Sequence, residues 1–289
     1  MMDRQKSYVN NVKTLYLIPS PIGNLGDITL RTIETIKEVD ILFCEDTRVT
    51  NKLLMHLNIK KDLGSFHEFN KNTQKNKIIE LLDNGKNVGL ISDAGMPLVS
   101  DPGYEVCTLA IERGYNVVSL PGPSALLTAL IVSGIKPYPF MFYGFLDHKK
   151  NNKVKELTKL KFYEETLIFY EAPHRINETL NCMYEVFGDR EVSICRELTK
   201  KYEEVIRGTL SEVKDLDDII GEIVVVVSGY VEEKIDMTNM TIVDHVNIYL
   251  KSGFDLKESM KKVAKDLGIS KSDVYREYTL QRDDEEWEF

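Results

Sequence analysis

A long loop at residues 92–103, Ser-Asp-Ala-Gly-Met-Pro-Leu-Val-Ser-Asp-Pro-Gly, constrains the fold of this chain more than any other stretch. It follows the apolar run 88–91, which is typical of a buried strand, and it precedes apolar residues at helical spacing. Two prolines and two glycines keep the loop out of regular structure. Ligands of open α/β sheets bind beyond the carboxyl ends of strands, so the loop is a candidate ligand site. An ordinary turn with a helix cap would use the same residue types.

The same order of strand, loop and helix recurs before and after this loop. Apolar runs at 14–18, 41–44 and 117–120 each end in a polar or Pro/Gly-rich turn. This alternation predicts a mainly parallel sheet with helices on its faces. The first turn, 19–27, lacks the Gly-x-Gly-x-x-Gly spacing, which removes most support for a Rossmann dehydrogenase. We expect Asp27 to cap the helix that follows this turn.

Beyond residue 125 the pattern changes, because strand-like runs follow one another with fewer helices between them. The sequence therefore predicts an α/β fold with an N-terminal α/β domain at 1–124 and a second α/β domain with a mixed sheet at 125–230. Helical spacing then predicts a small C-terminal helical domain at 231–289. Its helices and Gly-containing turn resemble a helix-turn-helix, but few basic residues lie in the last helix, so a plain bundle without DNA binding is favoured.

Charge and cysteine content limit the class of protein. The net charge of −9 argues against a broad phosphate-binding surface, yet residues 148–161 carry six lysines and one glutamate. Such a cluster either binds phosphates or forms a solvated helix face. Four widely spaced cysteines indicate neither a zinc site nor a disulfide framework, which fits a reducing cytoplasm. The N-terminus lacks the apolar core of a signal peptide, and no apolar run approaches the length of a membrane span.

Charged groups also follow two further strand-like runs. Glu45, Asp46 and Arg48 come after the run at 41–44, and Glu171 and Arg175 come after the run at 166–170. A helix cap with an acidic first turn explains the first group equally well. No metal-binding motif, P-loop, nucleophile elbow or Cys–His pair is present. The residues by themselves indicate a two-domain α/β enzyme without naming its substrate.

Seven ordered motifs together resemble a known family. They are IPSPIGNLGDITLR (18–31), CEDTR (44–48), SDAGMPLVSDPG (92–103), PGPSA (121–125), YGFL (143–146), YEAPHR (170–175) and RELTKKYEE (196–204). They are similar to those of the bacterial ribosomal RNA small subunit methyltransferase I family, whose fold resembles that of tetrapyrrole methylases. The resemblance implies transfer of a methyl group from S-adenosylmethionine to the ribose 2′-hydroxyl of a cytidine in 16S rRNA. It also implies a homodimer and a cofactor cleft between two α/β domains.

The resemblance places the cofactor at the 92–103 loop, the PGPSA turn and the second domain. The expected binding residues are Ser92, Asp93, Ala94, Gly95, Val99, Asp101, Ser124, Ala125 and Ala172. A base would help deprotonate the hydroxyl, and the candidates are Asp46 first, then Glu45 and Glu171, with Arg48 and Arg175 orienting a phosphate or carboxylate. From the lysine cluster we expect Lys149, Lys150 and Lys153 to bind RNA phosphates. Two alternatives stay open: a precorrin-type tetrapyrrole methylase and a non-catalytic, ribosome-associated RNA binder.

Overall fold

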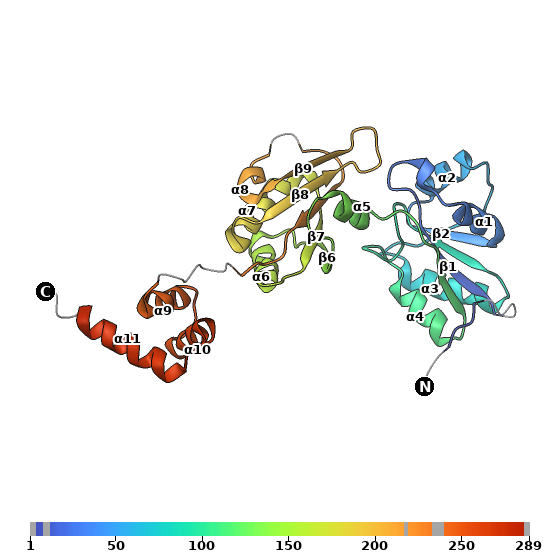
Figure 1. The fold of residues 1–289 in the computed structure, drawn as a ribbon. Coiled ribbons are helices and arrows are strands. Elements are labelled where there is room, and N and C mark those ends of the chain that lie inside the picture. Colours follow the sequence, from blue (N-terminus) through green and yellow to red (C-terminus); the bar gives the residue numbers. More distant parts are fainter. Residues whose placement is uncertain (1–3, 8–11, 217–218, 233–239, 286–289) are drawn as a thin grey trace. The chain divides into compact units, whose positions relative to one another are not determined.

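The computed structural model describes residues 4–7, 12–216, 219–232 and 240–285, and for 281–285 it describes the backbone alone. The chain divides into two compact units, Met1–Tyr230 and Val231–Phe289. The first unit contains two five-stranded sheets, and the second is helical (Figure 1). The predicted α/β class with a C-terminal helical region is confirmed. Because both sheets belong to one unit, the predicted boundary at residue 124 stays a prediction.

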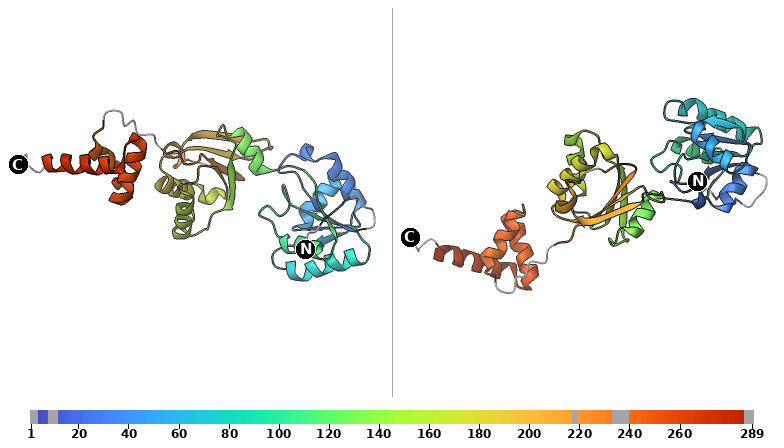
Figure 2. Two further views of the ribbon diagram at one scale, coloured as in Figure 1. Left: turned by 60° about the horizontal axis from the view of Figure 1, so that its bottom comes forward. Right: turned by 90° about the horizontal axis from the view of Figure 1, so that it is seen from above.

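The first sheet is parallel throughout and has the order β3-β2-β4-β1-β5. Its strands are β1 (Thr14–Ile18), β2 (Ile41–Cys44), β3 (Leu63–Ser65), β4 (Val88–Ile91) and β5 (Asn116–Ser119). One face packs on α1 (Leu30–Glu38) and α2 (Thr47–His56), and the other on α3 (Lys71–Asp83) and α4 (Tyr104–Glu112) (Figure 2). Burial of both faces explains why these strands are continuous apolar runs.

The helix caps correct one expectation and support another. Asp27 does not cap α1; it ends the short 3-10 helix η1 (Leu25–Asp27). The cap is Thr29, whose hydroxyl accepts the N–H of Thr32 at 3.0 Å. Asp46 does cap α2, because its carboxylate accepts the N–H of Arg48 at 2.8 Å. The capping role that the sequence left open for Asp46 is therefore present.

The second sheet is mixed, as predicted, and has the order β6-β7-β10-β8-β9. Its strands are β6 (Phe140–Phe145), β7 (Thr166–Glu171), β8 (Glu191–Arg196), β9 (Glu204–Thr209) and β10 (Ile223–Val227), and only β6 and β7 run parallel. Helix α5 (Ala125–Val132) packs on one face. On the other face lie α6 (Lys150–Leu160), α7 (Ile176–Phe187) and α8 (Leu210–Val213). The short 3-10 helix η2 (Pro173–Arg175) connects β7 to α7.

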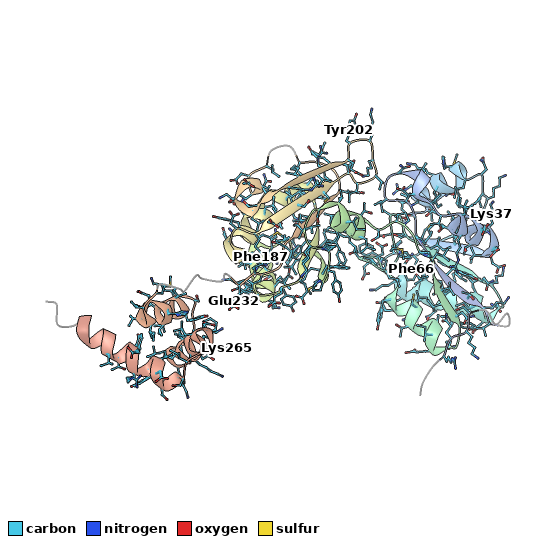
Figure 3. All side chains as sticks on the ribbon, viewed as in Figure 1. Lys37, Phe66, Phe187, Tyr202, Glu232 and Lys265 are labelled. Carbon is cyan, nitrogen blue, oxygen red and sulfur yellow. The ribbon has the colours of Figure 1, made fainter. Side chains whose placement is uncertain are left out.

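Each sheet has its own apolar core. Phe66 lies in the core under α3 and α4, and Phe187 lies in the core under α6 and α7 (Figure 3). Ile22 follows β1 of the first sheet, yet it packs with α5 and with strands of the second sheet. The turn after β1 therefore links the two halves of the first unit through apolar contacts.

The second unit consists of α9 (Ile242–Lys251), α10 (Leu256–Leu267) and α11 (Lys271–Glu285). The three helices pack around a small apolar core that includes Val246, Val263 and Val274. Within the described part of the chain no helix is both long and apolar enough to cross a membrane. The four cysteines, all in the first unit, are free and buried.

Candidate functional site

The first unit contains a cavity of about 430 Å³ that is lined by loops and strand ends from both sheets. This volume lies within the usual range for small-molecule sites. The half of the unit around the first sheet contributes the turn after β1 and the 92–103 loop. The half around the second sheet contributes the start of α5, the ends of β6 and β7, the loop after β8 and the start of β10. The lining residues are Ile22, Ala94, Gly95, Met96, Val99, Ser100, Asp101, Ser124, Ala125, Phe145, Tyr170, Glu171, Ala172, Pro173, Leu198, Gly221, Glu222, Ile223 and Val224.

The 92–103 loop is held in an unusual backbone conformation. Leu98 and Ser100 have φ values of 70° and 71°, in the left-handed region that non-glycine residues rarely adopt. Ser20 and Gly95 exchange two backbone hydrogen bonds of 3.0 Å, which tie this loop to the turn after β1. The Ser92 hydroxyl donates to Asp101 across the loop at 2.7 Å. These contacts fix the loop, and backbone strain of this kind concentrates at functional sites.

Three carboxylates on the first-sheet side form no ion pair with a lysine or arginine among the described residues, although the charge of His67 partly opposes the pKa shift of Glu45. Burial raises the pKa of Asp101 and of Asp93 above the usual value, although the N–H of Asp46 donates to Asp93 at 3.2 Å and opposes the shift. Burial, followed by the charges of Asp101 and Asp93, also raises the pKa of Glu45. Carboxylates in such surroundings gain from a bound cation. This side of the site is therefore electronegative.

On the second-sheet side, by contrast, the buried carboxylate is paired. Glu171 is 3% exposed and lies 2.7 Å from the guanidinium of Arg175. It also accepts the hydroxyl of Thr179 at 2.5 Å and the N–H of Ala172 at 2.7 Å. Lys153 donates to Thr179 at 2.9 Å and so extends this network beneath the cavity wall. Glu171 is thus a well-satisfied buried ion with little capacity left for a ligand.

Comparison with known proteins identifies the family to which this arrangement belongs. Residues 14–214 match the model of the tetrapyrrole (corrin/porphyrin) methylases. The ribosomal RNA small subunit methyltransferase I of Bacillus subtilis is 49% identical over 98% of this chain and 100% of that protein. The protein of the same name from Halalkalibacterium halodurans is 46% identical over 96% and 99%. This chain belongs to the ribosomal RNA small subunit methyltransferase I family.

Solved structures show the same fold at low sequence identity. A diphthine synthase superposes with a TM-score of 0.59 at 15% identity, covering 76% of this chain and 92% of that one. The uroporphyrin-III-C-methyltransferase of Thermus thermophilus gives 0.52 at 16% identity, with coverage of 74% and 93%. Both likenesses concern the fold alone. The family and the tetrapyrrole methylase-like fold that the motifs predicted are confirmed.

The family and its fold imply S-adenosylmethionine as the methyl donor, and the cavity fits this cofactor. Small residues such as Ala94, Gly95 and Ala172 let backbone groups approach a ligand closely. Apolar side chains from both sheets offer surface for an aromatic base, and Ser124 offers polar atoms. The carboxylate of Asp101, which has a hydroxyl partner but no cation, lies in the wall, where it favours a ligand with positive charge such as a sulfonium.

Seven of the nine residues expected to bind the cofactor line the cavity: Ala94, Gly95, Val99, Asp101, Ser124, Ala125 and Ala172. Ser92 instead braces the loop, and Asp93 lines a separate cavity of about 220 Å³ beside the turn after β1. Other lining residues, among them Leu198 and the stretch 221–224, were not among the expected binding residues. Ile223 pairs with Glu171 across antiparallel strands, so the start of β10 lies beside the end of β7. Only the strand directions reveal this proximity, although the 196–204 motif already singled out Leu198.

Asp46, the first of the candidate bases, is a poor proton acceptor in this structure. Hydrogen bonds from the Arg48 side chain and backbone N–H lower the pKa of Asp46 to about 2, so its carboxylate is a weak proton acceptor. Neither Asp46 nor Glu45 lines the cavity, and Arg48 is largely exposed. Glu45, whose pKa is raised, lines a small pocket together with Asp101. Of the candidate bases, Glu45 therefore has the more suitable electrostatic setting.

The lysine cluster requires a correction. Lys149 and Lys150 are exposed, but the side chain of Lys153 is 0% exposed. Its ammonium donates to Glu178 at 2.7 Å and to Thr179 at 2.9 Å, so it is already paired and cannot reach an RNA phosphate. Lys153 shares the buried stripe of α6 with Leu157 and Leu160. The prediction that Lys153 binds RNA is wrong for this reason.

Proposed function

We propose that this enzyme transfers a methyl group from S-adenosylmethionine to the 2′-hydroxyl of a cytidine ribose in 16S rRNA. The observation that carries the donor side is the cavity wall, in which small residues surround the uncompensated carboxylate of Asp101. The acceptor side is supported by relatives named for small subunit ribosomal RNA that match this chain over almost its full length. The cytidine and the 2′-oxygen follow from the motif resemblance.

The reaction is a displacement at carbon in which positioning provides much of the rate. The donor supplies a methyl carbon on a positively charged sulfur, which is a good leaving group. The protein has to hold that carbon and the 2′-oxygen in line and keep water out. The wall formed by Ile22, Tyr170 and Leu198 helps to keep water out. Glu171 and Arg175 fix the end of β7 through their ion pair rather than by touching a proton of the substrate.

Glu45 is our candidate for the group that accepts the proton of the hydroxyl. Its raised pKa makes its carboxylate a better acceptor than that of Asp46. General-base catalysis typically contributes about 10²–10⁴-fold. Single-turnover methylation should therefore fall by roughly 100-fold in Glu45→Gln and by only a few-fold in Asp46→Asn, with cofactor affinity kept in both. Equal rates for Glu45→Gln and wild type would leave positioning as the whole account.

RNA docking and assembly are the remaining parts of the proposal. Lys149 and Lys150 present their charges at the start of α6, where they are free to approach phosphates, apart from the loose pair of Lys150 with Glu185 at 3.6 Å. A homodimer would bring two such segments to one RNA face and offset the net negative charge of each chain. A monomer mass in light scattering at micromolar concentration would contradict the dimer.

A methylation assay tests the reaction directly. Small ribosomal subunits from cells that lack this enzyme are incubated with labelled S-adenosylmethionine, and the RNA is digested to nucleosides. We expect the label in 2′-O-methylcytidine. Label on a base, or transfer to a precorrin instead of RNA, would contradict the proposal in favour of another methylase activity. Failure to bind S-adenosylmethionine in calorimetry would support the non-catalytic RNA binder.

A further inference from the structure

The loop that joins β8 and β9, residues 197–203, has a strained backbone and many hydrogen bonds for a surface loop. Glu197 and Thr199 have φ values of 51° and 67°, both in the left-handed region. The N–H of Glu197 donates to the carbonyl of Glu222 at 3.0 Å, and the N–H of Thr199 donates to the carboxylate of Glu203 at 2.5 Å. Backbone strain persists only where surrounding contacts over-determine it. The conformation of this loop is therefore fixed rather than adaptable.

The base of the same loop forms part of the cofactor site. Leu198 is 6% exposed and lines the cavity. Thr199 accepts the N–H of Asn24, in the turn after β1, at 3.1 Å. The ammonium of Lys200 lies 2.7 Å from Glu197 and 3.1 Å from Glu222, and Glu222 also lines the cavity. The loop thus joins both halves of the first unit at the edge of the site.

The tip of the loop presents an aromatic ring and a cation to solvent. Tyr202 is 67% exposed, and Figure 3 shows it at the outer end of this loop. The ammonium of the exposed Lys201 lies 5.2 Å from the centre of the Tyr202 ring. Within the described part of the chain, Tyr202 makes no hydrogen bond and packs in no apolar core. Neither side chain contributes to the fold, although a strained and heavily bonded loop holds both in place.

We propose that Tyr202 stacks on an unpaired base of the RNA substrate, close to the methylated nucleotide, while Lys201 contacts an adjacent phosphate. This inference rests on the proposed function. RNA is recognised mainly in single-stranded segments, whose bases stack on exposed aromatic side chains. A rigid loop whose base lines the cofactor cavity sets the distance between the stacked base and the reactive methyl group. Fixing a flanking base in this way would help to align the 2′-oxygen.

Affinity and its salt dependence distinguish the two roles. Tyr202→Ala should weaken binding to small ribosomal subunits that lack the methyl group by roughly 5- to 150-fold, the range found for loss of one stacked base. Tyr202→Phe keeps the ring and should stay within about 2-fold of wild type. Because stacking involves no counterion release, the salt slope should not change in either variant. Lys201→Ala should instead reduce the slope by about 0.7–0.9 log units.

Tyr138→Ala is the matched control, because Tyr138 is also exposed, at 78%. It lies just before the first residue of β6, whereas the cavity-lining Phe145 is the last residue of that strand. The control variant should bind RNA like wild type. Cofactor affinity, measured for every variant, checks that the site is folded. If wild type methylates the subunits and Tyr202→Ala binds them equally well, this inference is wrong while the proposed function stands. If wild type neither binds nor methylates RNA, the proposed function fails first.

Discussion

The two walls of the cavity differ in how their carboxylates are paired. On the first-sheet side, Asp101 has a hydroxyl partner but no cation, and burial raises its pKa. On the second-sheet side, Glu171 is paired with Arg175, and Glu197 is paired with Lys200, which together with the N–H of Glu222 lowers the pKa of Glu197. A wall with uncompensated carboxylates is ready for a cationic ligand. A wall that supplies its own cations gains rigidity and shape instead.

The largest expected effect on stability comes from removing the partner of the buried Lys153 on the second-sheet side. Glu178 and Glu185 both lie on α7 and are 50% and 55% exposed, but Glu178 pairs with the buried Lys153 and Glu185 with the exposed Lys150. Glu178→Ala leaves a buried ammonium without its counterion, which should cost about 3–5 kcal/mol of unfolding free energy. Glu185→Ala should cost less than about 1 kcal/mol. Denaturant unfolding of the two variants measures this difference.

A second substitution shows whether the cost comes from the buried charge itself. Lys153→Met in the Glu178→Ala background removes the unpaired ammonium and keeps an apolar chain of similar length. We expect it to restore most of the lost unfolding free energy, because the penalty lies in the uncompensated ion. A double variant that is less stable than Glu178→Ala would contradict this account. Substitution of Lys153 should not change RNA affinity, whereas substitution of Lys149 and Lys150 should lower it.

The next effect sharpens the comparison at the first wall. Asp101→Asn keeps an acceptor for the hydroxyl of Ser92 but removes the negative charge. Affinity for S-adenosylmethionine should fall roughly 10-fold, whereas affinity for S-adenosylhomocysteine, which has no sulfonium charge, should fall only about 2-fold. Glu222→Gln is the control on the other wall, because Glu222 lines the cavity but is paired with Lys200. Calorimetry with both ligands gives the ratio, and an equal loss for the two ligands in Asp101→Asn would argue against a charge interaction.

The difference between the walls also explains what the sequence could and could not predict. Polar residues after β4 were recognisable because they follow a parallel strand, and parallel strands place their carboxyl ends at one edge. The contribution of Gly221 and Glu222 depends on β10 running antiparallel to β7, which no local pattern reveals. Lys153 was misjudged from charge alone. Its spacing to Leu157 and Leu160 places it on the buried stripe of α6, so helical periodicity was the better guide.

The smallest effect is a pH dependence of opposite sign for the two walls. Burial raises the pKa of Asp101 above its ordinary 3.8. The contribution of Asp101 to the unfolding free energy is therefore fully present below pH 3.8 and is lost as pH rises through the folded-state pKa. The pKa of Glu197 is lowered from 4.5, so its contribution is present above 4.5 and is lost as pH falls. Between about pH 3.5 and 6.5, cofactor-free Asp101→Asn should gain Tm relative to wild type as pH rises, and Glu197→Gln should lose it, each by roughly 1–2 °C. Thermal unfolding at several pH values checks the signs.

Saturating S-adenosylmethionine should reduce or reverse the gain in Tm of Asp101→Asn, because a bound cation favours the ionised carboxylate that the free protein disfavours. If both variants shift in the same direction with pH, the two walls do not differ in charge compensation.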